Sequence, residues 1–444
     1  MDNTRRNFIK GAGAIAASMM MPMTFGMRNA HAVTGGKKLV VLNLHGGNDG
    51  LNLAVPMGVG PTSSADQYAL YQGYRPNIHI PLADLLPVGA DMGGQQFGLH
   101  PAMASLQPYF SNLAVFPATH SSVGTNANRS HFYQMDLYGA GMEDNNPVAQ
   151  DGKGWIGRYF DSKYPSGSAP SGIIGQDFTS GTHGETKGET FLLQMSNPEN
   201  ISLGANATLT NEIWNEVKAL TGVQPGTYGG DFHDKQIRLF DEVLSRLETD
   251  VNFDRVPAVA YPSGRLGDAF ERAGNMLMDL PELEVIQIAH DGYDTHRDQI
   301  TNDPVTGTYD PLTGRQANLL KQWADAIAAL YANLDAIDPQ LRSNVIVTVQ
   351  TEFGRTVKEN ANFGTDHGNA SCWMAFGDSV TGGVYGSYPG LETENLNGGN
   401  WLKPTIDYRD IFSEILGQSH LGLANGGDAF PNYSVPSSPI GFIA

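Results

Sequence analysis

The sequence predicts an α/β fold with a doubly wound, mostly parallel sheet that is flanked by helices and interrupted by loop-rich insertions. Two observations predict this class. Short, β-branched apolar runs, typical of strands buried on both faces, alternate with stretches in which apolar residues recur every three or four positions, typical of amphipathic helices. In addition, acidic, basic and histidine side chains follow several of the apolar runs, as they do where α/β proteins bind ligands.

The apolar runs and the helical periodicities give the order of the elements. Strands are predicted at residues 37–44, 113–116, 284–289, 345–349 and 373–376, and helices at residues 99–110, 131–138, 237–247, 266–280, 320–337 and 408–416. The long helix at 320–337 joins two predicted strands, so we expect a right-handed crossover unit in a parallel sheet.

The first 32 residues are typical of a twin-arginine export signal. Residues 4–10 place two adjacent arginines before two apolar residues, an apolar run follows over residues 11–23, and Ala30-His-Ala32 offers a small-x-small cleavage site. The run is too short to span a membrane, and no later segment reaches about 18 apolar residues. We therefore expect the twin-arginine machinery as a partner and a periplasmic or secreted mature chain, residues 33–444, without an integral membrane segment.

Charge and cysteine content argue against two classes of protein. The chain has 444 residues with 27 basic and 46 acidic side chains, and its net charge of −19 argues against a nucleic-acid partner. The only cysteine, Cys372, excludes a disulfide framework and is interpreted as a small apolar residue of the core. We expect residues 33–444 to form a single domain, in which the region 145–280, whose first part is rich in small and polar residues, is an insertion or a cap.

Candidate ligands follow four of the predicted strands. Carboxylates can crowd together only where a cation or protons neutralise them, so the simplest interpretation is a site for one or two divalent ions, with Zn, Mn, Mg and Ca all open. The predicted metal ligands are Asp49, Asp294, His296, Glu352, Asp366 and His367. A metal of this kind can activate a hydroxyl nucleophile and stabilise charge on a phosphoryl or sulfuryl group.

Three further residues are candidates for catalysis. Ser130 precedes the predicted helix at 131–138, where it either caps the helix or serves as a nucleophile, with His131 directly behind it. Arg129 and Arg355 are the candidates for clamping an anionic substrate. Nucleotide cofactors are not expected, because the glycines after the first strand lack the spacing of a dinucleotide or phosphate loop.

The motifs, in their order along the chain, are similar to a bacterial family catalogued as domain of unknown function 1501. They are LNLHGGNDGLN, NRSHF, DGYDTHRDQ, TEFGRT and GTDHG, together with the twin-arginine start. That family resembles the alkaline phosphatase and sulfatase superfamily, which implies a doubly wound α/β core and a two-metal site for phosphoryl or sulfuryl transfer. The resemblance further implies that Asp49, Asp294, His296, Glu352 and His367 bind metal and that Ser130 is the nucleophile.

Two departures from the superfamily pattern bear on activity. Phe353 stands where the superfamily has the histidine of an Asp-His pair, and Asp294-x-His296 is tighter than the usual Asp-x-x-x-His spacing. Both departures are compatible with a one-metal site. The leading hypothesis is an exported metal-dependent hydrolase that acts on phosphate or sulfate esters. The alternatives are a non-catalytic exported binding protein with the same fold, which Phe353 favours, and a structural protein whose carboxylates hold calcium to stiffen the loops.

Overall fold

The computed structural model describes most of residues 33–444. The described residues are 36–60, 65–121, 123, 128–143, 152–165, 172–179, 184–190, 192–198, 243, 246–303 and 307–444. The predicted export signal at 1–32 lies outside these residues, as does most of the predicted helix at 237–247 and much of the region 145–280.

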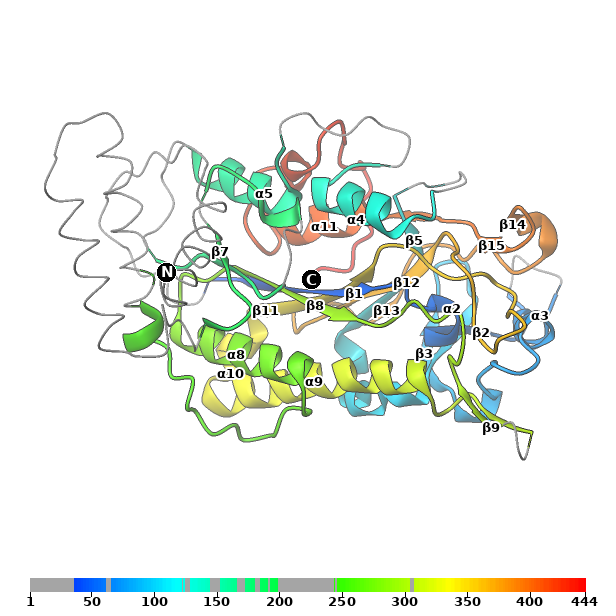
Figure 1. Ribbon diagram of the computed structural model, residues 1–444. Coiled ribbons are helices and arrows are strands. Elements are labelled where there is room, and N and C mark those ends of the chain that lie inside the picture. The colour runs from blue at the N-terminus through cyan, green and yellow to red at the C-terminus, as the bar shows by residue number, and fades with distance from the viewer. Residues whose placement is uncertain are drawn as a thin grey trace, which may run out of the picture.

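A nine-stranded sheet runs through the middle of the molecule (Figure 1). Its strand order is β13-β5-β12-β11-β1-β8-β6-β7, and β16 also pairs with β5. The strands are β1 (Lys38–His45), β5 (Leu113–His120), β6 (Gly175–Asp177), β7 (Leu193–Gln194), β8 (Val285–Asp291), β11 (Val345–Thr351), β12 (Ser371–Phe376), β13 (Gly383–Val384) and β16 (Ile406–Asp407).

The centre of the sheet is parallel. β1 lies between β8 and β11 and pairs in parallel with both, so the carboxyl ends of these three strands share one edge of the sheet. β12 runs antiparallel to β11 and to β5. The predicted α/β class with a mostly parallel sheet is therefore confirmed. The strand predicted at 373–376 is β12, and its antiparallel direction could not be inferred from its apolar composition.

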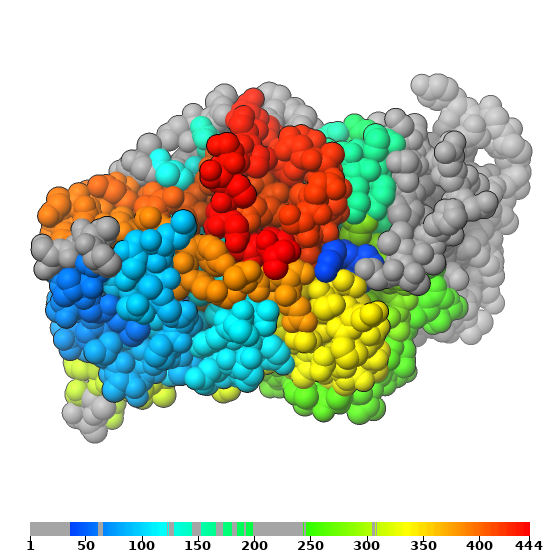
Figure 2. Space-filling model, turned by 180° about the vertical axis from the view of Figure 1, so that it is seen from behind, coloured from blue at the N-terminus to red at the C-terminus, as the bar shows by residue number. Residues whose placement is uncertain are grey.

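Helices cover both faces of the sheet (Figure 1). On one face lie α4 (His131–Ala140), α5 (Trp155–Lys163) and α11 (Tyr408–Leu416), and on the other lie α8 (Arg265–Asp279), α9 (Arg315–Ile337) and α10 (Pro339–Ser343). Seen from behind, the C-terminal segment in red lies above the α9 and α10 layer in yellow (Figure 2). No helix among the described residues is long and apolar enough to cross a membrane.

Strand β1 shows how the sheet packs against the helices on its two faces. Its side chains alternate, so that Val40 and Leu42 join the hydrophobic cluster under α8 and α9, whereas Leu39 and Val41 join the cluster under α5 and α11. All four are fully buried. The apolar stripe of α9 that the sequence predicted is buried from Leu320 to Leu334. Burial on both faces explains why the strand reads as a continuous apolar run.

The remaining elements are short. They are α2 (Gly50–Leu53), β2 (Ala54–Met57), α3 (Gln67–Tyr74), β3 (Leu86–Ala90), β4 (Gln96–Leu99), β9 (Thr301–Asp303), β10 (Thr308–Asp310), β14 (Leu396–Asn397) and β15 (Trp401–Leu402), with 3-10 helices η1 (Leu82–Asp84), η2 (Pro101–Asn112), η4 (Gly184–Thr186), η6 (Thr393–Asn395) and η7 (Gly426–Ala429). The predicted amphipathic helix at 99–110 is η2, and Pro108 inside it lacks the N–H that a continuous α-helix needs.

The buried Lys38 lies at the amino end of β1, at the sheet edge opposite the carboxyl ends of the strands. Its side chain bonds the backbone directly after helix α8. The Lys38 ammonium donates to the carbonyl oxygens of Leu280 (3.3 Å), Pro281 (3.1 Å) and Leu283 (2.6 Å), just after α8. Burial lowers the pKa of Lys38 to about 8, although the charges of Glu284 and Glu282 act in the opposite direction.

We predict that this lysine makes stability depend on pH. Between the folded pKa of about 8 and the ordinary value of 10.5, the unfolded chain binds more protons at Lys38 than the folded chain. The free energy of unfolding therefore rises with pH across this window, and Lys38→Met removes that rise. Urea denaturation of both proteins at several pH values between 8 and 10.5 measures the difference, and parallel pH profiles would contradict it.

Candidate metal centre

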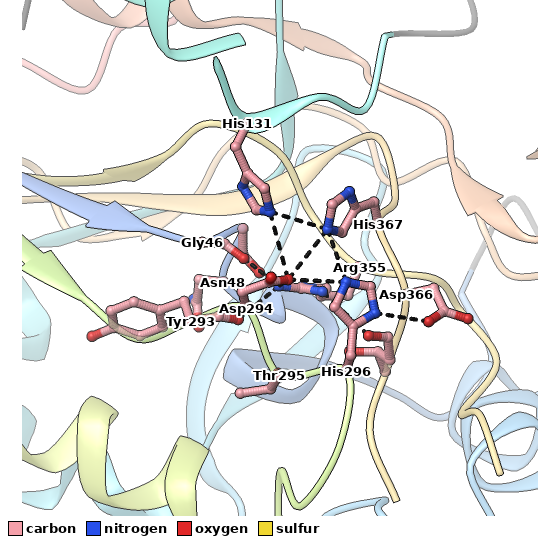
Figure 3. A network of polar contacts seen from close by, with 12 residues as sticks. Gly46, Asn48, His131, Tyr293, Asp294, Thr295, His296, Arg355, Asp366 and His367 are labelled. Atoms are coloured by element: carbon pink, nitrogen blue, oxygen red, sulfur yellow. Dashed lines mark hydrogen bonds and ion pairs between the residues drawn. The ribbon is translucent and has the colours of Figure 1, made fainter. Parts of the chain in front are cut away.

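Loops from three strand ends meet at one point. The loops after β1 and β8 bring Gly46 and Asp294 together, and α4 adds His131 from above (Figure 3). Glu352, directly after β11, accepts from the Gly46 N–H at 2.8 Å. Gly46 has a φ of 117°, and a Cβ on it would lie only 2.4 Å from the backbone nitrogen of Asp294. Only glycine allows the first loop to approach the second so closely. This contact is the structural reason for the first glycine of the pair that follows β1.

Three imidazoles and one carboxylate converge in the cluster that we call the His3Asp cluster (His131, Asp294, His296 and His367; Figure 3). Asp294 Oδ1 lies 3.5 Å from His131 Nε2, 3.1 Å from His296 Nε2 and 3.2 Å from His367 Nε2. His367 Nε2 is also 3.0 Å from the Nε2 atoms of both other histidines. The ligand atoms of His131, Asp294 and His367 all lie within 4.8 Å of one another, and His296 Nε2 contacts two of them.

The opposite ring nitrogen of each histidine meets an acceptor. His131 Nδ1 is 2.7 Å from Glu352 Oε1, His296 Nδ1 is 2.9 Å from Asp366 Oδ1, and His367 Nδ1 is 2.8 Å from the carbonyl oxygen of Arg129. A carboxylate or carbonyl oxygen accepts, so these contacts are hydrogen bonds in the tautomer that carries its proton on Nδ1. In a neutral imidazole, Nε2 then presents a lone pair, and all three lone pairs are directed into the cluster.

The electrostatics agree with this protonation pattern. Burial alone would raise the pKa of Glu352, but hydrogen bonds from His131 and from backbone N–H groups hold it below its ordinary value. Burial likewise opposes ionisation of Asp294, yet the hydrogen bond and charge of Arg355 lower its pKa. The pKa of His367 is lowered, mainly by burial and also by the charges of Arg355 and His131. The carboxylates are thus ionised, and His367 is neutral at pH 7.

Arg355 holds the loops in place. Its side chain is fully buried, and its guanidinium donates to the carbonyl oxygens of Gly46, Gly47 (2.6 Å), Tyr293 (2.9 Å) and Thr365 (3.2 Å) and to Asp294 Oδ1 (2.7 Å). The sequence suggested that Arg355 clamps a substrate anion. The structure instead directs its donors to the protein's own loops, so the side chain supports the cluster from below.

Phe353 is the apolar wall of the cluster. It is fully buried, and its ring centroid lies 4.8 Å from that of His131 and 4.8 Å from that of His367. The ring therefore packs against two imidazoles and restricts their rotation. The position that departs from the superfamily motif is filled by a residue that orients two of the converging histidines.

The structure places the predicted ligands in the cluster, next to the cluster, and, for Asp49, in a separate network. Asp294, His296 and His367 lie in the cluster itself. Glu352 and Asp366 lie outside the cluster and contact it through Nδ1 of His131 and Nδ1 of His296, respectively. His131, which the sequence singled out only as a neighbour of Ser130, supplies the fourth converging atom. The signal that could have found it is the NRSHF motif, which places a histidine at the start of a helix next to a strand end.

Asp49 lies in a different polar network. Arg75 binds both of its carboxylate oxygens, at 2.6 and 3.0 Å, and the Gln299 amide donates to Oδ2 at 2.7 Å. Both Asp49 and Arg75 are buried, so the guanidinium compensates the carboxylate. The prediction of Asp49 as a metal ligand departs from this geometry, because its oxygens are already engaged and because it is not among the converging side chains.

Ser130 and Arg129 lie beside the cluster. Ser130 occupies the N-cap position of α4 and is exposed, and its hydroxyl makes no capping hydrogen bond. Of the two interpretations that the sequence left open, the side-chain cap is therefore absent from the structure. The Arg129 guanidinium lies 3.8 Å from the centroid of the Trp401 ring and 3.3 Å from Asn369 Oδ1. Partial burial lowers the pKa of Arg129.

Comparisons with solved structures return several chains of low similarity. Solved structures that resemble this chain include the lipoteichoic acid synthase LtaP from Listeria monocytogenes, with 8% identity over 84% of this chain and 73% of that chain at a TM-score of 0.33. A protein in the alkaline phosphatase superfamily from Vibrio parahaemolyticus has 10% identity over 86% and 71% at a TM-score of 0.30. The C-terminal periplasmic domain of EcEptC from Escherichia coli, in complex with Zn, has 12% identity over 80% and 77% at a TM-score of 0.33.

One segment of the chain matches a family model. Residues 271–428 match the family described as "Protein of unknown function (DUF1501)", which confirms the resemblance inferred from the motifs over that segment. This segment contains Asp294, His296, Glu352 and His367, whereas His131 precedes it. No curated protein matches the chain. Neither the family description nor structural likeness at such low scores indicates a reaction, so function is inferred from the site.

We predict that Arg355→Lys destabilises the protein by about 2–4 kcal/mol, because a lysine cannot reproduce the forked donors and leaves buried carbonyl oxygens without a partner. The matched control is Arg342→Lys, which alters a partly exposed arginine that bonds Asp335 and Asp378. That exchange should cost no more than about 1 kcal/mol. Urea denaturation of the three proteins measures both effects, and equal stabilities for the two variants would contradict the role of Arg355.

Proposed function

We propose that this chain is an exported, metal-dependent hydrolase of phosphate or sulfate esters, and that the His3Asp cluster binds its metal. The observation that carries the proposal is the convergence of three Nε2 lone pairs on Asp294 Oδ1 at 3.1–3.5 Å. Four electron-rich atoms so close together repel one another unless a cation lies between them. Protonation of a histidine is the other way to relieve the repulsion, and for His367 the lowered pKa opposes it.

The donor set fits a transition metal better than calcium. Three imidazole nitrogens and one carboxylate are typical ligands of Zn²⁺, whereas calcium takes six to eight oxygen ligands. A histidine that donates its other N–H to a carboxylate or carbonyl is also typical of zinc sites. Glu352, Asp366 and the carbonyl of Arg129 take this part here. These observations count against the calcium-stiffened alternative and favour zinc among the metals that the sequence left open.

The chain's own residues would prepare the site. Glu352 and Asp366 hold protons on Nδ1 and so keep Nε2 free for a metal, and Arg355 fixes Asp294 and partly neutralises it. A bound divalent metal would act as a Lewis acid and stabilise the negative charge that develops during phosphoryl or sulfuryl transfer. Asp294 and His296 retain 44% and 42% of their side-chain exposure, so the cluster is accessible to a substrate from that side.

Two residues beside the cluster would act on the ester. The Ser130 hydroxyl is exposed, directly precedes a cluster histidine in the chain and lies at the amino end of α4, so it is the candidate nucleophile. Arg129, positioned by Trp401 and Asn369, is the candidate for binding the anionic group. A non-catalytic binding protein with a resident metal is the alternative, and it differs from the proposal only in having no turnover.

We predict that purified mature protein contains a stoichiometric transition metal, which elemental analysis detects. His131→Ala removes one of the four converging atoms and should strongly reduce the metal content. Glu352→Gln keeps the shape but removes the charge that orients His131, and should weaken metal affinity roughly 10–100-fold. The controls are His79→Ala and Glu394→Gln, which alter residues outside the cluster and should leave the metal content unchanged. Protein without metal, or equal losses in the controls, would refute the metal centre.

We also predict metal-dependent turnover of aryl phosphate or aryl sulfate esters. Chelation should abolish turnover and re-addition of metal should restore it, because the metal supplies the charge stabilisation. Ser130→Ala should lower kcat by several orders of magnitude with the metal content unchanged, whereas Ser343→Ala on α10 should have no effect. A metal-loaded protein that turns over no ester of either class would favour the binding-protein alternative.

A further inference from the structure

Two loops carry three of the four converging side chains, and these loops lie against each other. The loop after β8 holds Asp294 and His296, and the loop after β11 holds His367. A Cβ on Gly364 would lie only 2.4 Å from the carbonyl oxygen of Thr295, so the two backbones are in close contact. The position of one loop relative to the other therefore decides whether the ligand atoms converge.

One buried amide joins the two loops. Gln299 Oε1 accepts from the Thr295 hydroxyl at 2.9 Å and from the Thr365 hydroxyl at 3.0 Å. Gln299 Nε2 donates to Asp49 Oδ2 at 2.7 Å and to Gln316 Oε1 at 2.8 Å. All five side chains are buried. The amide thus uses both of its donors and both lone pairs of its oxygen.

The ion pair behind Gln299 fixes the direction of its amide. Arg75 donates to both oxygens of Asp49, and a carboxylate paired in this way only accepts, so the NH₂ side of Gln299 faces it. Oε1 then faces the two loops, and the hydroxyls of Thr295 and Thr365 donate to it. A chain of hydrogen bonds with one possible direction therefore runs from the ion pair to both loops.

We propose that Gln299 is a positioning residue of the metal centre, which ties both loops to the Asp49 carboxylate and so sets the spacing of the converging atoms. Thr295 joins Asp294 to His296 in the chain, so its position affects both ligands. Asp49, which the sequence predicted as a metal ligand, would then act on the centre without touching it. The effect on metal binding rests on the proposed function, whereas the link between the loops does not.

Titration of the metal-free mature protein with Co²⁺, followed by visible absorption, tests the effect on metal binding. Gln299→Met keeps the length of the side chain but removes its four side-chain hydrogen bonds. It should weaken Co²⁺ binding roughly 10–100-fold and change the absorption band of the bound ion, because the ligands lose their spacing. Thr365→Val removes one donor with little change in shape, so it should weaken binding by a smaller factor and provides the test if Gln299→Met does not fold.

The matched control is Thr348→Val, which alters a buried threonine of β11 that lies in neither loop. Its Co²⁺ affinity and absorption band should equal those of the wild type. Wild-type affinity in Thr365→Val or in folded Gln299→Met, or an equal loss of affinity in Thr348→Val, would overturn the proposal.

Hydrogen exchange of the metal-free proteins separates the link between the loops from metal binding. The Thr365 N–H donates to the Thr295 carbonyl oxygen at 3.0 Å, and the Gln299 N–H donates to that of Phe363 at 3.0 Å. These two amides should exchange faster in Gln299→Met and in Thr365→Val, with the amides of β1 unchanged. Wild-type exchange in both variants would contradict the link. If the wild type binds no Co²⁺, the proposed metal centre fails, while faster exchange of these amides still supports Gln299 as the link between the loops.

Discussion

The candidate site depends on one buried guanidinium. Arg355 joins the loops after three strands, because its donors reach the carbonyl oxygens of Gly46, Tyr293 and Thr365 as well as the carboxylate of Asp294. Parallel strands deliver these loops to the same edge of the sheet but do not fix the distances between them. The planar fork of arginine does so, since its donors point in set directions. The glycine at 46 permits this close packing.

The loops, once fixed, force electron-rich atoms together. The Nε2 atoms of the three histidines approach Asp294 Oδ1, and each Nδ1 lies at hydrogen-bond distance from a carboxylate or carbonyl oxygen. Phe353 closes one side and packs against the rings of His131 and His367. A geometry that is repulsive without a cation and favourable with one is the physical content of the metal hypothesis. The aromatic residue that first argued against an enzyme thus contributes to the site's construction.

Local patterns predicted the fold well and the site in part. The long strands and α9 were readable because burial on both faces and helical periodicity are local properties. The direction of β12 and the short edge strands depend on distant pairing. At the site, the sequence predicted candidate residues near strand ends but did not show which of them meet in space. His131, for example, is 221 positions from Glu352 and 236 from His367. Asp49 illustrates the same limit, since its partner Arg75 lies in a segment whose composition resembles a surface loop.

The central claim is that three imidazoles and Asp294 share a metal ion. X-ray absorption spectroscopy of the metal-loaded mature protein tests it most directly, because it distinguishes nitrogen ligands in imidazole rings from oxygen ligands. The account predicts a first coordination shell with three imidazoles, which falls to two imidazoles in His131→Ala. A shell composed only of oxygen, or one that His131→Ala leaves unchanged, would contradict it.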